Sequence, residues 1–263
     1  MKRRPAVFVM VDMEGISGIC LSSQVMEDEK GLYQAARRYM VWDVNACVDG
    51  CVRGGAGRVV VRDAHYTGFN LIWEELDPRA EYIQGRSGLQ RMPDIQSFDA
   101  VILLGYHAMA GTPQAILEHT MSSGAWQNFW MNGVKCGEVA IDAGIAGDHG
   151  VPVIMVSGDD KVCAEAERFI PGVVTAVVKR GLDCNGGVLL PRQRAHEIIR
   201  DSAARAVKSI GRIKPYKVAH PVTMRLEMVS RKIVPAHRPD VKVIDGRTYE
   251  VTAPTVEQAL NML

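Results

Sequence analysis

The stretch Ala6-Val7-Phe8-Val9-Met10-Val11, followed directly by Asp12-Met13-Glu14-Gly15, determines the expected fold of this chain. Six apolar residues in succession are typical of a short strand buried on both faces, as in a parallel sheet. The carboxylates of Asp12 and Glu14 then lie at the end of a core strand, and they point the same way if the strand extends that far. Burying them without a partner is costly, so a shared cation is expected. The alternative is that they only cap loop backbone or pair with arginines.

The composition narrows the class of protein. The chain has 263 residues, of which 47% are hydrophobic and 23% charged, and its formal net charge is +1. This length is enough for one large domain, or for one domain with a smaller unit attached. The balanced charge argues against nucleic acid and membrane surfaces as partners. The apolar run 6–11 is too short for a signal peptide or a membrane span, and no later stretch approaches 18 apolar residues.

The cysteines indicate a reducing compartment. None of the six forms a CxxC pair, and in a chain of this size without a signal sequence they are expected to be mostly buried thiols of a cytoplasmic protein. A catalytic cysteine is the alternative, and its position makes Cys136 the first to test. The six are Cys20, Cys47, Cys51, Cys136, Cys163 and Cys184.

Strands alternate with helices as far as about residue 180, which favours an α/β fold with a largely parallel sheet and flanking helices. After the glycine-rich stretch 181–187, the pattern changes to a helix and several short strands. We therefore expect an α/β metal-binding catalytic domain over residues 1–187 and a smaller α+β C-terminal domain over 188–263. Asn132-Gly133 and Asp245-Gly246 are typical of tight hairpin turns.

Three of the expected strands end in residues that can bind a metal. Asp12 and Glu14 follow the first strand, His65 follows the second, and His107 follows the strand at 100–104. The carboxyl ends of parallel strands meet at one edge of the sheet, where ligands bind in open α/β folds. Glu138, at the start of a later helix, is positioned in the sequence to supply a fifth ligand.

Two imidazoles and three carboxylates form a donor set that suits Zn²⁺, and Mn²⁺ or Co²⁺ would also fit. Five protein ligands exceed what one open catalytic zinc needs, so two metals that share one carboxylate are expected. Two divalent ions, three carboxylates and one hydroxide together give a neutral site. Such paired ions lie roughly 3.5–4 Å apart, form hydroxide near neutral pH and polarise a carbonyl.

Each of these residues also has a purely structural interpretation. A single histidine after a strand is more often a core residue than a ligand, and Asp63 fits a loop cap or a partner of a histidine better than a ligand. His119 lies in the polar segment 108–125, which follows a strand end and is typical of an active-site loop. The alternative for His119 is a solvent-facing loop histidine. Asp159-Asp160 is interpreted first as a helix cap.

Together these motifs resemble those of the D-aminopeptidase (DppA-like) family of metallopeptidases, peptidase family M55. They follow one another in order from residue 11 to about 180, and beyond residue 190 mainly the layout is similar. The sequence departs from the family in detail at Cys136 and in its short terminal helix. The residues that carry the resemblance are Val11-Asp12-Met13-Glu14-Gly15-Ile16-Ser17-Gly18, Asp63-Ala64-His65, Gly105-Tyr106-His107-Ala108, His119, Gly137-Glu138 and Gly158-Asp159-Asp160.

The resemblance implies a cytoplasmic di-zinc aminopeptidase that forms a ring-like homo-oligomer, such as a decameric ring, around its active sites. It implies that two zinc ions per chain are held by five residues, with the first of them as the bridge: Asp12, Glu14, His65, His107 and Glu138. It also implies a catalytic role for His119, either donating a proton or stabilising the tetrahedral intermediate.

The expected function is therefore a zinc-dependent aminopeptidase that releases N-terminal residues from short peptides by means of a metal-bridging hydroxide. A preference for D-amino acids such as D-Ala follows from the resemblance alone. Two other functions stay open at this point. One is a di-metal hydrolase that acts on a non-peptide amide or an ester, and the other is a metal-stabilised assembly protein without turnover.

Overall fold

The first expected strand, β1 (Ala6–Val11), lies inside a seven-stranded sheet, which we call sheet A. The computed structural model describes residues 3–231 and 234–263. In sheet A, β1 pairs in parallel with β2 (Arg58–Asp63) on one side and with β4 (Ala100–Tyr106) on the other. The strand order is β3-β2-β1-β4-β7-β8-β9, and β9 alone of these strands is antiparallel to its neighbour. The other strands of sheet A are β3 (Glu81–Ile83), β7 (Val153–Asp159), β8 (Val174–Asp183) and β9 (Gly186–Leu189).

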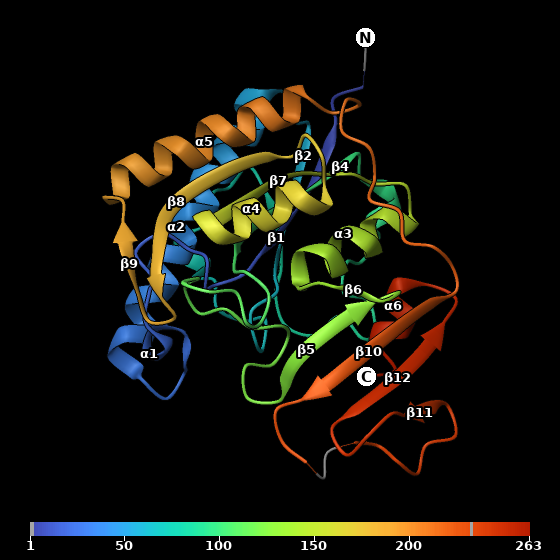
Figure 1. The fold of residues 1–263 in the computed structure, drawn as a ribbon. Coiled ribbons are helices and arrows are strands. Elements are labelled where there is room, and N and C mark those ends of the chain that lie inside the picture. Colours follow the sequence, from blue (N-terminus) through green and yellow to red (C-terminus); the bar gives the residue numbers. More distant parts are fainter. Residues whose placement is uncertain (1–2, 232–233) are drawn as a thin grey trace.

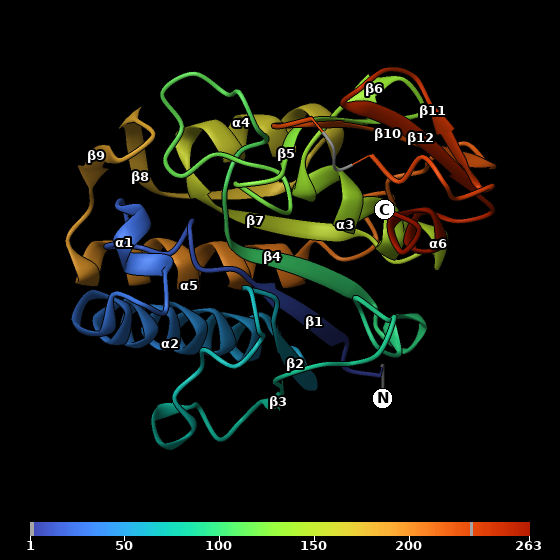
Figure 2. The same ribbon diagram turned by 90° about the horizontal axis from the view of Figure 1, so that it is seen from below.

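Helices cover both faces of sheet A and give the molecule three layers (Figure 2). The long helices α2 (Lys30–Gly54) and α5 (Arg192–Lys208) lie side by side on one face. Helices α3 (Glu138–Asp148) and α4 (Asp160–Phe169) cover the other face. Gly50 allows the close approach of α2 and α5, because a Cβ there would lie 2.3 Å from the carbonyl oxygen of Arg200.

A second, antiparallel sheet lies beside the three layers at the lower right of Figure 1. Its strand order is β11-β12-β10-β5-β6, and the Asn132-Gly133 turn that joins β5 to β6 has positive φ at both residues, as a type I′ turn requires. The strands of this second sheet are β5 (Trp126–Met131), β6 (Val134–Lys135), β10 (Val222–Met228), β11 (Val241–Val243) and β12 (Thr248–Ala253). The remaining helical segments are α1 (Ser22–Val25), α6 (Val256–Leu260) and the 3₁₀ turns Trp73–Glu75 and Ile95–Ser97.

The predicted fold class is confirmed: a largely parallel sheet carries helices on both faces, and a smaller antiparallel sheet accompanies it. The glycine-rich stretch 181–187 is not a linker, however, because it forms the end of β8, its turn and the start of β9. Helix α5 belongs to the layer beside α2, and β5 and β6 belong to the second sheet. Both sheets therefore use residues from each side of position 187, and a division into domains 1–187 and 188–263 stays a prediction.

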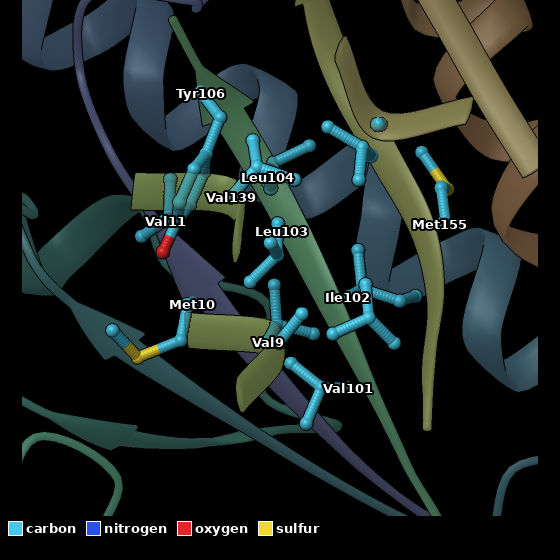
Figure 3. Packing of buried hydrophobic residues seen from close by; sticks show 14 of the residues in the cluster. Val9, Met10, Val11, Val101, Ile102, Leu103, Leu104, Tyr106, Val139 and Met155 are labelled. Atoms are coloured by element: carbon cyan, nitrogen blue, oxygen red, sulfur yellow. The ribbon is translucent and has the colours of Figure 1, made fainter. Parts of the chain in front are cut away.

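The core lies between sheet A and its helices. Side chains of β1 alternate between the two faces, and every residue from Val7 to Val11 is fully buried. Figure 3 shows Val9 and Val11 beside Ile102 and Leu104 of β4, with Val139 of α3 packed near them. Each such fully buried aliphatic side chain stabilises the fold by about 1.5–3 kcal/mol. Among the described residues, no helix combines the length and the apolar character needed to cross a membrane.

Candidate metal centre

The polar residues after the strands meet at one edge of sheet A. β1 and β4 are neighbours there, and the chain leaves them toward opposite sides of the sheet, so their carboxyl ends mark the point where the strand order reverses. Open α/β sheets bind ligands at such a point. Asp12 and Glu14 follow β1, His65 follows β2, and His107 follows β4, while Glu138 is the first residue of α3. All five side chains are buried.

The first group of ligand-type atoms comes from Asp12, Glu14 and His65. His65 Nδ1 lies 3.2 Å from Asp12 Oδ1 and 3.1 Å from Glu14 Oε2. The other ring nitrogen, His65 Nε2, lies 3.1 Å from the main-chain oxygen of Val25. A carbonyl oxygen only accepts, so Nε2 carries a proton, and Nδ1 is the nitrogen that faces the carboxylates. Histidines that bind metals are fixed in this way by a carbonyl or carboxylate behind the ring.

The second group comes from His107, His119 and Glu138. His107 Nε2 lies 3.3 Å from Glu138 Oε1, and His107 Nδ1 lies 3.1 Å from the carbonyl oxygen of Ala108. The ring of His119 stacks on that of His107 with the centroids 3.9 Å apart and an angle of 11° between the planes. His119 Nδ1 donates to the carbonyl oxygen of Leu117 at 2.9 Å, which leaves its Nε2 as the available nitrogen.

Asp12 connects the two groups. Its Oδ1 faces His65 at 3.2 Å, and its Oδ2 faces His107 Nε2 at 3.4 Å. The main-chain N–H of Met13 also donates to Oδ1, at 2.9 Å, and this hydrogen bond fixes the orientation of the carboxylate. His107 Nε2 is fully buried and makes no hydrogen bond to any described residue, although two carboxylates flank it. A buried nitrogen in that position fits a metal ligand better than a structural side chain.

The electrostatics of the site require added positive charge. Burial alone would raise the pKa of Asp12, but the neighbouring imidazoles of His107 and His65 outweigh burial and hold the pKa well below its ordinary value. Burial is likewise outweighed at Glu138, where the adjacent imidazole of His107 lowers the pKa to about 2. The carboxylates raise the pKa of His65 and of His107 well above the ordinary value, although burial opposes this. The ionised carboxylates of Asp12 and Glu138 in one buried site are stabilised by protons on the imidazoles or, equally, by divalent cations.

The site opens into a cavity of about 600 Å³. Its walls come from the α1 segment, the polar loop after β4 and the tip of the β8–β9 hairpin. The hairpin tip contributes Cys184 and Asn185, and Asn185 Oδ1 accepts the main-chain N–H of Ser22 at 2.8 Å. Two walls of the cavity are therefore joined by a hydrogen bond. The volume is suited to a small ligand or a short peptide.

Three residues considered from the sequence besides the candidate ligands are Asp63, Asp159 and Cys136. Asp63 accepts hydrogen bonds from Asn70 and from the main-chain N–H of His65, so it supports the loop that carries the histidine. Asp159 caps α4 by accepting the N–H groups of Lys161 and Val162. Cys136 is buried, and burial raises the pKa of its thiol to about 12, which argues against a nucleophilic role.

The sequence did not indicate two charged residues of the site. Lys179 is fully buried in β8, and its Nζ donates to the carbonyl oxygens of Glu14 at 2.5 Å, Ile16 at 2.9 Å and Ile19 at 2.7 Å. It thereby holds the turn that carries Glu14, and burial lowers the pKa of the ammonium to about 8. A lysine after Val177-Val178 in an apolar strand was the available signal. Arg91 lies in the cavity wall, and nothing in its local sequence marks it.

The fold and the site together define an α/β protein with a buried carboxylate–histidine centre, an arrangement suited to metal-dependent hydrolysis. Comparison with known proteins specifies the family. The M55 peptidase family, described as D-aminopeptidase, matches residues 6–263, and the chain belongs to this family of metallopeptidases.

Two relatives are similar over most of their length. A D-aminopeptidase of Bacillus subtilis (strain 168) is 34% identical over 213 residues, which cover 80% of this chain and 76% of the relative. The solved structure of the Zn-dependent D-aminopeptidase DppA from Bacillus subtilis, described as a self-compartmentalizing protease, matches with a TM-score of 0.92. That match has 29% sequence identity and covers 98% of this chain and 96% of DppA.

Proposed function

We propose that this protein is a zinc-dependent aminopeptidase that removes N-terminal residues, D-amino acids such as D-Ala among them, from short peptides. The observation that carries the proposal is the position of Asp12 between two histidine–carboxylate groups, with one oxygen directed at each. A bridging carboxylate of this kind suits a pair of divalent cations. The description of DppA as Zn-dependent supports zinc, and the descriptions of both relatives support D-residues.

The residues present fit two zinc ions. Asp12, Glu14 and His65 would hold one, and Asp12, His107 and Glu138 the other. Zinc at this position would polarise the scissile carbonyl and lower the pKa of water. The donor set supports this assignment in two respects. The buried nitrogen of His107 makes no hydrogen bond to a described residue, and a carbonyl oxygen lies behind each histidine ring.

His119 is the residue that we assign to proton transfer. Its Nδ1–H is bound to the carbonyl oxygen of Leu117, so Nε2 is the nitrogen that exchanges a proton with the reacting groups. Stacking on His107 fixes the plane of the ring. The carboxylates of Glu27, Asp28 and Glu118 also line the cavity, and they would attract the free ammonium group of a peptide.

The assembly that we infer is a homo-oligomer that encloses its active sites. DppA is self-compartmentalizing, and this chain covers nearly all of DppA. The loop after β2 exposes three aromatic side chains within eight residues, which we call the aromatic patch: Tyr66 is 81% exposed, Phe69 65% and Trp73 71%. Apolar groups in such number at a surface are typical of an interface. We also infer a cytoplasmic location, supported by six cysteines that are all unpaired within the described residues.

The proposal is tested by measuring the metal content of the protein and its hydrolysis of dipeptides. We expect about two zinc ions per chain by elemental mass spectrometry of undialysed protein, and chelator-sensitive release of alanine from D-alanyl rather than L-alanyl dipeptides. Glu138→Ala should lower kcat/KM by more than about 100-fold, because even the loss of an outer partner of a metal ligand costs about 10- to 100-fold. The control is Glu74→Ala, which removes an exposed carboxylate.

Three results would contradict the proposal. Zinc near zero after incubation with the metal would remove the centre itself. Bound zinc without hydrolysis of any peptide would instead indicate an assembly protein, and hydrolysis of an ester or a non-peptide amide alone would indicate another di-metal hydrolase.

A further inference from the structure

We propose that Arg91 is the positioning residue that holds Glu138 in the orientation required for metal binding, and that the C-terminal helix holds Arg91. The inference rests on the zinc site proposed above. Arg91 lies in the loop between β3 and β4 and does not follow a strand end as the candidate ligands Asp12, His65 and His107 do. Its side chain is 16% exposed and lines the cavity.

The guanidinium of Arg91 holds two carboxylates of α3 at once. Its Nε donates to Asp142 Oδ1 at 2.5 Å, and its Nη2 lies 3.0 Å from Asp142 Oδ2 and 3.2 Å from Glu138 Oε2. Glu138 and Asp142 are four residues apart and therefore lie on the same face of the helix. A planar guanidinium matches this pair, whereas a lysine ammonium lacks the fork of donors that it requires.

The two oxygens of Glu138 consequently have different partners. Oε2 is bound by Arg91, while Oε1 lies 3.3 Å from His107 Nε2 and accepts the main-chain N–H of Met121 at 2.8 Å. Oε1 is therefore the oxygen directed at the candidate metal position. Among the described residues, Arg91 is the donor that binds Oε2, so its removal would free the carboxylate to rotate.

The guanidinium of Arg91 is needed next to Glu138 because a second buried carboxylate, that of Asp142, lies there. Asp142 is completely buried, and the hydroxyl of Tyr106 donates to its Oδ2 at 2.6 Å. Without Arg91, two carboxylates one helical turn apart would repel each other in a buried region. Arg91 thus opposes this repulsion and sets the direction of Glu138 at the same time.

The C-terminal helix holds the loop that carries Arg91. The main-chain N–H of Arg91 donates to Glu257 Oε1 of α6 at 2.6 Å, and Asn261 Nδ2 donates to the carbonyl oxygen of Leu89 at 3.0 Å. These contacts span more than 160 residues of sequence and connect the end of the chain to the site. They give the C-terminal segment a role in the centre although it supplies no candidate ligand.

The experiment measures zinc affinity and the melting temperature of the metal-free protein for four forms: wild type, Arg91→Met, the double variant Arg91→Met/Asp142→Asn, and Arg86→Met as the control. Arg86 is an exposed arginine of the same loop. Competition with a chromophoric chelator gives the zinc dissociation constants. We expect Arg91→Met to bind zinc about 10- to 100-fold more weakly, the usual cost of losing an outer partner of a metal ligand.

The double variant separates positioning from charge balance. Asp142→Asn removes the buried carboxylate charge that has lost its Arg91 partner. The melting temperature of the metal-free protein should therefore return toward the wild-type value, while the zinc affinity stays low. Wild-type zinc affinity in the double variant would overturn the positioning role, because Arg91 would then only balance Asp142. If neither variant that carries Arg91→Met folds, the zinc dissociation constant of Glu257→Ala tests the inference. Several-fold weaker zinc binding by Glu257→Ala supports the inference, and unchanged zinc binding overturns it. Failure of wild type and Arg86→Met to bind zinc would instead overturn the proposed function itself.

Discussion

At the scale of single residues, the centre depends on how the histidine rings are oriented. Each of the three rings donates one N–H group to a main-chain carbonyl oxygen and turns its other nitrogen toward the site. A ring fixed in this way cannot exchange its two nitrogens, so its lone pair stays in place for a cation or a proton. The rings differ in burial, however, since His119 is half-buried whereas His65 and His107 are buried.

The assignment of His119 to proton transfer leads to a prediction for His119→Phe. Phenylalanine can keep the stacking contact with His107 but cannot transfer a proton. We expect zinc content to stay at the wild-type value while kcat falls about 100- to 10,000-fold, the usual contribution of a general acid or base. Kinetics with elemental analysis of the same sample checks this. Unchanged kcat would remove His119 from the mechanism, and loss of zinc would make it a ligand, which its position near His107 and Glu138 also allows.

The candidate ligands could be predicted from the sequence because each lies within three residues of the end of an apolar strand or begins a helix. Local pattern is enough for such positions, since parallel strands bring their carboxyl ends together. Arg91 and Lys179 could not be found in this way. The guanidinium of Arg91 acts on residues 47 and 51 positions away, and the ammonium of Lys179 acts on carbonyls at least 160 positions away. No local periodicity carries such information.

At the scale of elements, most strands and helices follow from periodicity and turn residues, but their partners do not. The β5–β6 hairpin was predicted from Asn132-Gly133, yet its pairing with β10 depends on residues almost a hundred positions later. Residues 217–219 belong to no helix or strand. That segment lies against α3, where a Cβ at Gly147 would lie 1.8 Å from the carbonyl oxygen of Tyr216.

Helix α4 carries a buried carboxyl group whose effect on stability depends on pH. Glu165 Oε2 accepts the main-chain N–H of Met109 at 2.8 Å, while Oε1 is buried without a partner among the described residues. Burial, assisted by the charge of Glu138, raises the pKa of Glu165 to about 7, although the Met109 hydrogen bond, His107 and Arg168 oppose this. The folded state therefore holds a proton that the unfolded state loses above about pH 4.5, and this contribution to stability declines as the pH rises toward 7.

We accordingly expect Glu165→Gln to stabilise the metal-free protein at pH 8 by up to about 3 kcal/mol and to have little effect at pH 5, given 1.36 kcal/mol per pKa unit. The amide oxygen of glutamine can still accept the N–H of Met109. Urea unfolding of chelator-treated wild type and variant at the two pH values gives the difference. An equal effect of the substitution at both pH values would mean that Glu165 is ionised in the folded protein throughout this range.

At the scale of the whole molecule, the site lies where three parts of the chain meet. Sheet A supplies four of the candidate ligands, α3 supplies the fifth, and α6 holds the loop that carries Arg91. The aromatic patch begins at Tyr66, which follows His65 and lines the same cavity. A second copy of the chain that covered this patch would therefore also narrow the entrance to the cavity.

This geometry makes a prediction about both assembly and substrate length. Phe69→Ser/Trp73→Ser should shift the mass measured by light scattering from several chains toward one, because a buried aromatic at an interface contributes about 2 kcal/mol or more, or roughly 30-fold in the dissociation constant. Leu89→Ser is the control, since Leu89 is 76% exposed but lies in another loop. Dipeptide hydrolysis should persist in the double variant, whereas peptides too long for the closed assembly should become substrates. An oligomer of unchanged mass would assign the interface to another surface, and a single-chain wild type would contradict the proposed assembly.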